Sequence, residues 1–231
     1  MNREKVVVLT GAGVSAESGI KTFRDAGGLW EGHDVMEVAS PEGWRKDKEL
    51  VLDFYNQRRR QLKEVEPNDA HFALKDLELK YKVVVVTQNI DNLHERGGSS
   101  KVVHLHGELN KVRSTVDPSL IYEWNDDLNL GDKCEKGSQL RPHIVWFGEA
   151  VPMMDRALLE IASAQHVIII GTSMQVYPAA GLVGYAPRNA SIYYVDPRPS
   201  INAELSIRDN LEVFAENAGT GVRKVVEILL K

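Results

Sequence analysis

A glycine-rich turn near the start of the chain has the spacing of a phosphate-binding loop. The apolar run at residues 6–9 leads into Gly11 and Gly13, and Ala16 follows three residues later. In dinucleotide-binding folds the first glycine permits a tight turn, the second lets the backbone approach a pyrophosphate, and the third small residue lets the next helix pack closely. An ordinary tight turn before a helix is the alternative that this pattern leaves open.

Two histidines are candidate acid–base groups. His104 and His106 alternate along a short apolar segment, so they would lie on one face of a strand. A neutral imidazole can accept a proton near pH 7. A metal pair is a competing interpretation, but no further ligand with metal-site spacing stands near them in the sequence. A structural role is the third interpretation.

Polar side chains also follow the apolar run at residues 83–86. Gln88, Asn89 and Asp91 stand directly after it. At the end of a strand, their amide and carboxylate groups are placed to reach a ribose or a carboxamide. The alternative is a polar loop in which Asp91 or Asn92 caps the next helix.

An arginine lies on the apolar face of the helix predicted over residues 47–65. Arg58 follows Phe54 by four residues and Tyr55 by three, whereas the two arginines after it are expected to point elsewhere. A charge on a buried stripe needs a partner, and the guanidinium fork suits a carboxylate. Alternatively, Arg58 extends to the surface or pairs with a nearby acid.

The segment at residues 22–30 does not continue as a dehydrogenase would. In the usual dinucleotide fold a second strand follows within about twenty residues and ends in an acid that binds the ribose. Here two glycines stand among aromatic and charged residues without strand-like alternation. This composition favours either a flap that closes over a ligand or a surface loop with buried aromatic side chains.

Short apolar runs that alternate with helical stretches indicate an α/β fold with a Rossmann-like parallel sheet. The runs span residues 6–9, 83–86, 102–105, 143–146, 167–170 and 191–195. Residues 25–80, mainly helical, and residues 107–142, polar with little periodicity, are predicted insertions at the carboxyl edge of the sheet, where such folds bind ligands. We expect one domain over residues 1–231 with a small helical or irregular subdomain.

The composition limits the binding partners and the cellular location that we expect for this protein. The chain has 231 residues, of which 43% are hydrophobic, and a formal net charge of −5, so it can bury one sizeable core. No long basic run indicates nucleic acid. No apolar run approaches the length of a membrane helix or a signal peptide. One cysteine excludes an internal disulfide. We expect a monomeric cytoplasmic protein.

Together these motifs carry a family resemblance. Residues 11–20 read GAGVSAESGI, 22–25 read TFRD, 87–94 read TQNIDNLH, 104–109 read HLHGEL and 171–173 read GTS. In this order, and over essentially the whole chain, the set resembles the sirtuins, which are NAD-dependent protein-lysine deacylases. It is most similar to the small bacterial sirtuins that remove acidic acyl groups.

The resemblance implies NAD as the co-substrate and His106 as the catalytic base, with Asn89 and Asp91 around the nicotinamide. His104 is then a structural neighbour. Asp196 stands where the family usually has asparagine. The implied NAD-binding residues are Gly11, Ala12, Gly13, Glu17, Thr22, Phe23, Arg24, Trp30, Gln88, Asn89, Ile90, Asp91, Gly171, Thr172, Ser173, Asp196 and Ala218.

For the substrates, which are acyl-lysine proteins or peptides, the resemblance implies two kinds of contact. Tyr55 and Arg58 match the Tyr-x-x-Arg pattern with which sirtuins hold succinyl or malonyl carboxylates. The segment at residues 145–149 would pair its backbone with the peptide as an added strand, opposite residues 174–177. The implied substrate contacts are Tyr55, Arg58, Val145, Phe147, Gly148 and Val176.

The chain departs from the family pattern within residues 107–142. Most sirtuins hold a structural zinc there with four cysteines, but this segment contains only Cys134, and Ser114 stands where the first cysteine is expected. One thiol cannot build a closed tetrahedral site, so we expect neither zinc nor another metal. The module must then hold by packing, through Leu120, Tyr122, Trp124 and Leu128.

The sequence therefore predicts an NAD-dependent protein-lysine deacylase that favours succinyl or malonyl groups over acetyl groups and releases nicotinamide and O-acyl-ADP-ribose. Two alternatives stay open. One is a protein ADP-ribosyltransferase that uses the same NAD pocket. The other is a non-catalytic NAD-binding module, which the departure from the zinc pattern would favour.

Overall fold

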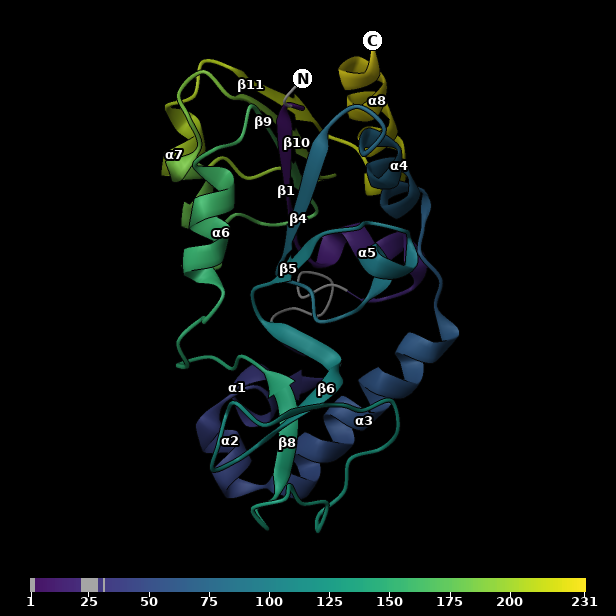
Figure 1. The fold of residues 1–231 in the computed structure, drawn as a ribbon, viewed down its shortest axis with the longest axis vertical. Coiled ribbons are helices and arrows are strands. Elements are labelled where there is room, and N and C mark those ends of the chain that lie inside the picture. The colour runs from purple at the N-terminus through teal and green to yellow at the C-terminus, as the bar shows by residue number, and fades with distance from the viewer. Residues whose placement is uncertain (1–2, 22–28, 31) are drawn as a thin grey trace.

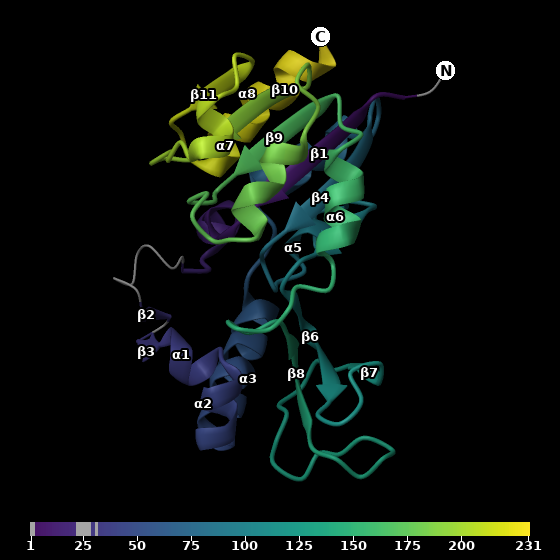
Figure 2. The same ribbon diagram turned by 90° about the vertical axis from the view of Figure 1, so that its left-hand side faces the viewer.

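The structure, a computed structural model, describes residues 3–21, 29–30 and 32–231. The chain forms two lobes joined by extended segments (Figures 1 and 2). The larger lobe is built on a six-stranded parallel sheet in the order β11-β10-β9-β1-β4-β5. Its strands are β1 (Lys5–Thr10), β4 (Lys82–Thr87), β5 (Val102–His104), β9 (His166–Ile170), β10 (Ser191–Val195) and β11 (Leu211–Phe214). The predicted Rossmann-like sheet is confirmed.

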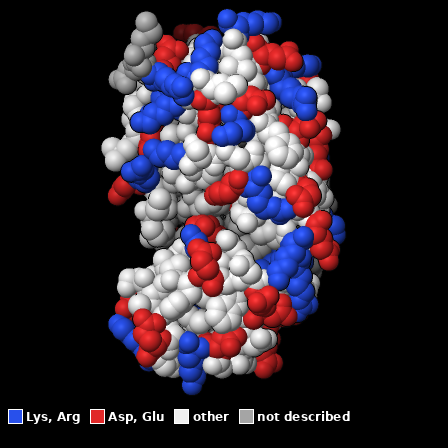
Figure 3. All heavy atoms as spheres, turned by 45° about the vertical axis from the view of Figure 1, so that its right-hand side comes forward, with Lys and Arg blue, Asp and Glu red and all other residues white. Residues whose placement is uncertain are grey.

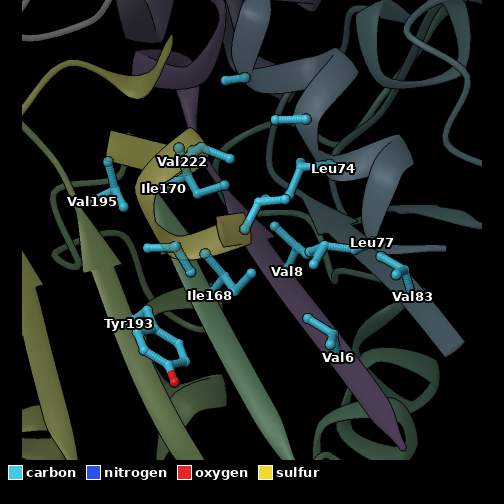
Figure 4. Close-up of a cluster of buried hydrophobic side chains, with 14 of the residues drawn as sticks. Val6, Val8, Leu74, Leu77, Val83, Ile168, Ile170, Tyr193, Val195 and Val222 are labelled. Atoms are coloured by element: carbon cyan, nitrogen blue, oxygen red, sulfur yellow. The ribbon is translucent and has the colours of Figure 1, made fainter. Parts of the chain in front are cut away.

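Helices cover both faces of this sheet, which explains why its central strands are apolar throughout. Alternate residues of β1 face opposite sides: Val6 and Val8 enter one buried cluster, and Val7 enters the other. The first cluster, drawn in Figure 4, includes Leu74, Leu77 and Val222. The covering elements are α4 (Asp69–Leu77) and α8 (Ala218–Leu230) on that face, and α6 (Met154–Ile161), η2 (Ala179–Tyr185) and α7 (Ala203–Ser206) on the other.

The smaller lobe packs three helices against a three-stranded antiparallel sheet, in the order β7-β6-β8. The run at residues 143–146, which the sequence places among the strands of the parallel sheet, instead lies at the end of β8. The elements are α1 (Val35–Val38), α2 (Pro41–Lys46), α3 (Lys48–Glu64), β6 (Gly107–Ser114), β7 (Ile121–Glu123) and β8 (Leu140–Ile144). Short elements complete the chain: η1 (Ala12–Ser18), the pair β2 (Leu29–Trp30) and β3 (His33–Asp34), and α5 (Leu93–Arg96).

The antiparallel sheet also corrects the expectation that residues 107–142 are irregular. Its strands carry many polar side chains because apolar positions that pack on α3 alternate with half-buried positions such as Glu108 and Arg113. Leu120, Tyr122, Trp124 and Leu128 all pack into the cluster that α3 forms with this lobe, as expected from the sequence.

Buried polar side chains also tie the lobe together. The Asn56 amide donates to the Leu128 carbonyl at 3.0 Å and accepts from the Leu128 N–H at 2.9 Å. Arg59, only 2% exposed, donates to Asn56 and to the Leu109 carbonyl. At the distal tip, the Cys134 thiol donates to the Ser114 hydroxyl at 3.3 Å and lies 3.2 Å from that of Ser138. These hydrogen bonds join α3 to β6 and to the loops beyond it.

The distal tip of this lobe keeps the residue spacing of a paired-cysteine zinc motif, but with different side chains. Ser114 and Asp117, and Cys134 and Gly137, each stand three positions apart, as the ligand pairs of paired-cysteine zinc motifs do. Within residues 3–21, 29–30 and 32–231, no three His, Cys, Asp or Glu side chains gather in a way that could hold a metal ion.

Removing metal ions is therefore expected to leave the fold unchanged. Dialysis against EDTA should not shift the thermal unfolding midpoint, whereas a structural zinc would be lost with its lobe unfolded. Zinc analysis and thermal unfolding before and after dialysis make the test; a stoichiometric zinc whose removal lowers the midpoint would contradict it.

Asn56→Ala should instead lower the free energy of unfolding by about 1–3 kcal/mol, because it leaves the Leu128 N–H and carbonyl buried without partners.

Two surface observations bear on the expected partners. On the face drawn in Figure 3, basic and acidic side chains are interspersed over both lobes. Among the described residues, no helix combines the length and the apolar character needed to cross a membrane.

Candidate active site

A cavity of about 640 Å³ opens at the carboxyl ends of the parallel strands. This volume is in the range of small-ligand sites, and the position is the usual one for ligands in α/β folds. Its lining combines the loops after β1, β4, β9 and β10 with the segment after β8, so both lobes contribute. Segments far apart in the chain therefore meet around one space.

The glycine turn after β1 forms part of this lining by packing on the loop after β9. The Gly13 N–H donates to the Gly171 carbonyl at 2.8 Å, and the Gly11 N–H donates to the Ile170 carbonyl at 3.0 Å. A Cβ added to Gly13 would lie 2.6 Å from the Gly171 Cα, and Gly171 has a φ of +59° that favours glycine. The predicted helix after the turn is the 3-10 helix η1, which is wound more tightly than an α-helix.

Asn89 and Asp91 are linked through a residue that the sequence reasoning missed. The Ser15 hydroxyl donates to Asp91 Oδ2 at 3.0 Å and accepts from the Asn89 amide at 3.2 Å. Burial raises the pKa of Asp91, whereas the Leu93 N–H and the Ser15 hydroxyl stabilise its carboxylate and oppose that shift. Ser15 is buried in η1, where a serine near a helix start is easily interpreted as a cap.

His106 lines the cavity in a defined tautomer. Its Nδ1 lies 3.0 Å from the Gln88 carbonyl, which can only accept, so Nδ1 carries the proton and Nε2 keeps its lone pair. Burial lowers the pKa of His106 below its ordinary value, and the Gln88 carbonyl opposes this only in part. The ring is therefore neutral at pH 7 and able to accept a proton. His104 is not among the described residues that line the cavity.

The predicted NAD contacts gather around the cavity as far as the structure describes them. Gln88 Nε2 donates to Thr172 Oγ1 at 3.1 Å, which joins the loops after β4 and β9. Glu17 accepts from the Gly219 N–H at 2.7 Å at the start of α8, where a helix favours negative charge. The lining includes Gly11, Ala12, Gly13, Glu17, Gln88, Asn89, Ile90, Asp91, Gly171, Thr172, Ser173, Asp196 and Ala218. Thr22, Phe23, Arg24 and the side chain of Trp30 lie outside the described residues.

The predicted substrate contacts divide into two groups. Val145, Phe147, Gly148 and Val176 line the cavity, and Phe147 is 45% exposed beside it. Tyr55 and Arg58 are not among its described lining residues. The Tyr55 hydroxyl is buried and accepts from Trp146 Nε1 at 3.0 Å, and the Arg58 guanidinium stacks on the Phe54 ring at 4.7 Å.

The helix that carries these two residues is buried more widely than its apolar stripe suggests. Helix α3 begins at Lys48 after the cap Asp47, close to the predicted start. Arg58 is only half-buried, whereas Arg59, which was expected to point away from the buried stripe, is enclosed between α3 and β6. The physical reason is that a second side of α3 faces β6 and the loop at residues 126–128, where Arg59 donates to the Leu109 carbonyl and Asn56 donates to the Leu128 carbonyl.

A charged brace, also missed from the sequence, holds the segment after β8. Arg141 pairs with Glu149 at 2.7 Å, and its guanidinium stacks on the Trp146 ring at 3.3 Å. Glu149 also accepts from the Trp146 N–H at 2.9 Å and pairs with Arg113. These contacts fix the wall of the cavity that Val145 and Phe147 form.

Comparison with known proteins places this site in a family. A protein of Helicobacter pylori named NAD-dependent protein deacylase is 58% identical over 228 residues, which cover 99% of this chain and 98% of that protein. Among solved structures, a Sir2 homologue in complex with NAD has a TM-score of 0.87 at 38% identity and covers 99% of this chain and 90% of its own. A Sir2 protein bound to an acetylated peptide has a TM-score of 0.80 at 29% identity, with 98% and 93% covered. The profile of the Sir2 family matches residues 11–178. This chain therefore belongs to the Sir2 family.

Proposed function

We propose that this chain removes acyl groups from protein lysines with NAD as co-substrate, and that it prefers acyl groups that end in a carboxylate. The first part agrees with the relatives, which are named NAD-dependent protein deacylases at 58% and 51% identity over nearly the whole chain. The observation that carries the proposal is the neutral His106 beside the Asn89–Ser15–Asp91 network in one cavity.

NAD supplies an activated bond between its ribose and nicotinamide. The glycine turn and the Thr172 loop would receive the dinucleotide, and Asn89 and Asp91 would hold the nicotinamide end. The acyl oxygen of the substrate then replaces nicotinamide at the ribose carbon. His106 Nε2 takes the proton from a ribose hydroxyl, which allows the acyl group to move onto the ribose. Water completes the reaction, and the products are free lysine, nicotinamide and O-acyl-ADP-ribose.

Nicotinamide release from NAD tests this proposal directly. We expect release with a succinyl-lysine peptide to exceed release with the acetyl-lysine version of the same peptide. His106→Tyr should abolish the deacylation of both peptides, because the base acts after nicotinamide has left. Transfer of labelled ADP-ribose to a protein without deacylation would support a transferase instead. NAD binding without release under either peptide would support a non-catalytic module.

Arg58→Met is expected to reduce desuccinylation by roughly 10–100-fold, because a charge-assisted hydrogen bond between guanidinium and carboxylate is worth about 1.5–3 kcal/mol. Deacetylation should change little, since an acetyl group has no carboxylate to lose its partner. The kcat/KM values for both peptides are compared with those of Arg60→Met, which removes an exposed arginine of the same helix. Equal loss on both peptides would rule out the carboxylate clamp.

A further inference from the structure

His104 and His106 are anchored in the same way but face different second partners. His106 Nδ1 lies 3.0 Å from the Gln88 carbonyl, and His104 Nδ1 lies 3.1 Å from the Asn89 carbonyl. Two alternate residues of one extended segment therefore hydrogen-bond to the carbonyls of two consecutive residues after β4. Among the described residues, only His104 of these two histidines has an acid against its other nitrogen: Nε2 lies 2.8 Å from Glu95 Oε1, on α5.

These partners determine the number of protons on His104. A carbonyl oxygen only accepts, so Nδ1 must donate to Asn89, and an ionised carboxylate only accepts, so Nε2 must donate to Glu95. Both nitrogens therefore carry hydrogen, and the ring is an imidazolium. For His106 the hydrogen bond to the Gln88 carbonyl requires a proton on Nδ1 only, and burial lowers its pKa, so this ring is neutral.

The charges around His104 favour this state. Burial opposes the charge, but the hydrogen bond and charge of Glu95, together with the charge of Glu108, raise the pKa of His104 above its ordinary value. In the described part of the chain, the other titratable groups that interact with it are the buried Asp91 and the buried, uncharged His94. The imidazolium in turn helps to keep the Asp91 carboxylate ionised.

We propose that His104 and Glu95 are a positioning pair, in which a doubly protonated His104 holds the Asn89 carbonyl and thereby orients the Asn89 side chain toward the cavity. The inference rests on the proposed role of Asn89 at the nicotinamide end of NAD. Its chemical consequence is that the two histidines act in opposite protonation states. His106 works as the neutral base, and His104 works as the fixed cation beneath the same loop.

Loss of one proton from the His104 imidazolium would break one of its two hydrogen bonds. A neutral ring has one N–H, so either the Asn89 carbonyl or the Glu95 carboxylate would face a lone pair. The kcat/KM for NAD should therefore fall on the alkaline side, as pH rises through the raised pKa of His104. In Glu95→Gln a neutral ring can satisfy both neighbours, because Nδ1–H donates to Asn89 and Nε2 accepts from the new amide. The alkaline decline should then disappear.

Histidine ring protonation is measured first, on the unmodified protein. Long-range ¹H–¹⁵N correlation spectra of the ¹⁵N-labelled chain distinguish an imidazolium from either neutral tautomer, and His104→Gln and His106→Gln assign two of the seven histidines. At pH 7 we expect His104 to be an imidazolium and His106 to be neutral with the proton on Nδ1. A neutral His104 at pH 7 would overturn the proposal.

Kinetics then test the positioning role. His104→Gln should lower kcat/KM for NAD by roughly 10–100-fold, the scale expected when a reacting group is misplaced, and remove the alkaline decline. Glu95→Gln should remove the decline while keeping most of the activity. The matched control is His166→Gln, since His166 pairs with Glu4 at 3.4 Å at the opposite end of the sheet. It should leave both the rate and the pH profile unchanged.

The outcomes separate this inference from the proposed function. Activity that His106→Tyr abolishes, but that His104→Gln leaves intact or leaves with a native alkaline decline, would refute the positioning pair and keep the deacylase. Absence of activity in the unmodified protein would refute the proposed function, while the histidine spectra would still test the charge of His104. Should His104→Gln fail to fold, Glu95→Gln and the spectra decide alone.

Discussion

Replacing His106 with glutamine is expected to lower kcat for deacylation by about 10²–10⁴-fold, the usual contribution of a positioned general base. Glutamine can still donate to the Gln88 carbonyl, as Nδ1 does at 3.0 Å. It cannot accept a proton from a ribose hydroxyl. The dissociation constant for NAD should change little, because the glycine turn and the Thr172 loop are untouched. Steady-state kinetics and calorimetric NAD titration of the same preparations make the measurement.

The assignment of His106 as the general base also predicts how kcat/KM depends on pH at low pH. Because burial lowers the pKa of His106, its ring stays neutral until the pH falls below about 6.5, the ordinary histidine value. On the acid side, the kcat/KM of the native chain should begin to decline only below that pH. A variant that keeps native kcat, or an acid decline that persists in His106→Gln, would show that another group is the base.

Acidification from pH 7.5 to 5 is expected to lower the free energy of unfolding by about 2 kcal/mol through His71 alone. The His71 and His94 rings are buried against each other, with centroids 4.9 Å apart. Burial lowers the pKa of His71 to about 4 and that of His94 well below its ordinary value. Unfolded histidines bind protons below about pH 6.5 whereas these do not, so the unfolded state gains as the pH falls.

His71→Gln is the matched variant for this test. His71 Nδ1 accepts from the Asn68 N–H in a capping box at the start of α4, and glutamine is a usual residue at that position. The substitution keeps the cap and removes the titration. Urea unfolding between pH 5 and 6.5, where most ordinary carboxylates stay ionised, should show a flatter dependence of stability on pH. An unchanged slope would show that His71 does not contribute.

The parallel sheet and the ligand loops are predictable because their physical requirements appear directly in the sequence. A strand buried on both faces must be apolar throughout, as residues 83–86 are, and a backbone crossing must use glycine, as Gly13 does. Polar residues placed directly after such strands, such as Asn89, meet at one edge because parallel strands end there together.

Features that depend on contacts across the chain are not visible in the sequence. The strands β6 and β8 carry several charged and polar residues, so they do not stand out as strands. The burial of Arg59 depends on a carbonyl fifty residues away in the chain, that of Leu109 on β6. The role of Ser15 likewise depends on its hydrogen-bond partners Asn89 and Asp91, which follow the end of another strand, β4.

The crossing of Gly13 and Gly171 affects how mutations in this chain are interpreted. Neither position has space for a methyl group, since an added Cβ would lie 2.6 Å or less from backbone atoms of the other loop. An inactive alanine variant at either glycine would therefore report a displaced loop rather than a lost contact with NAD. In a genetic screen these two positions would rank with the chemical residues while taking no part in the chemistry. Assigning roles from loss of function alone would thus overstate the size of the reactive centre.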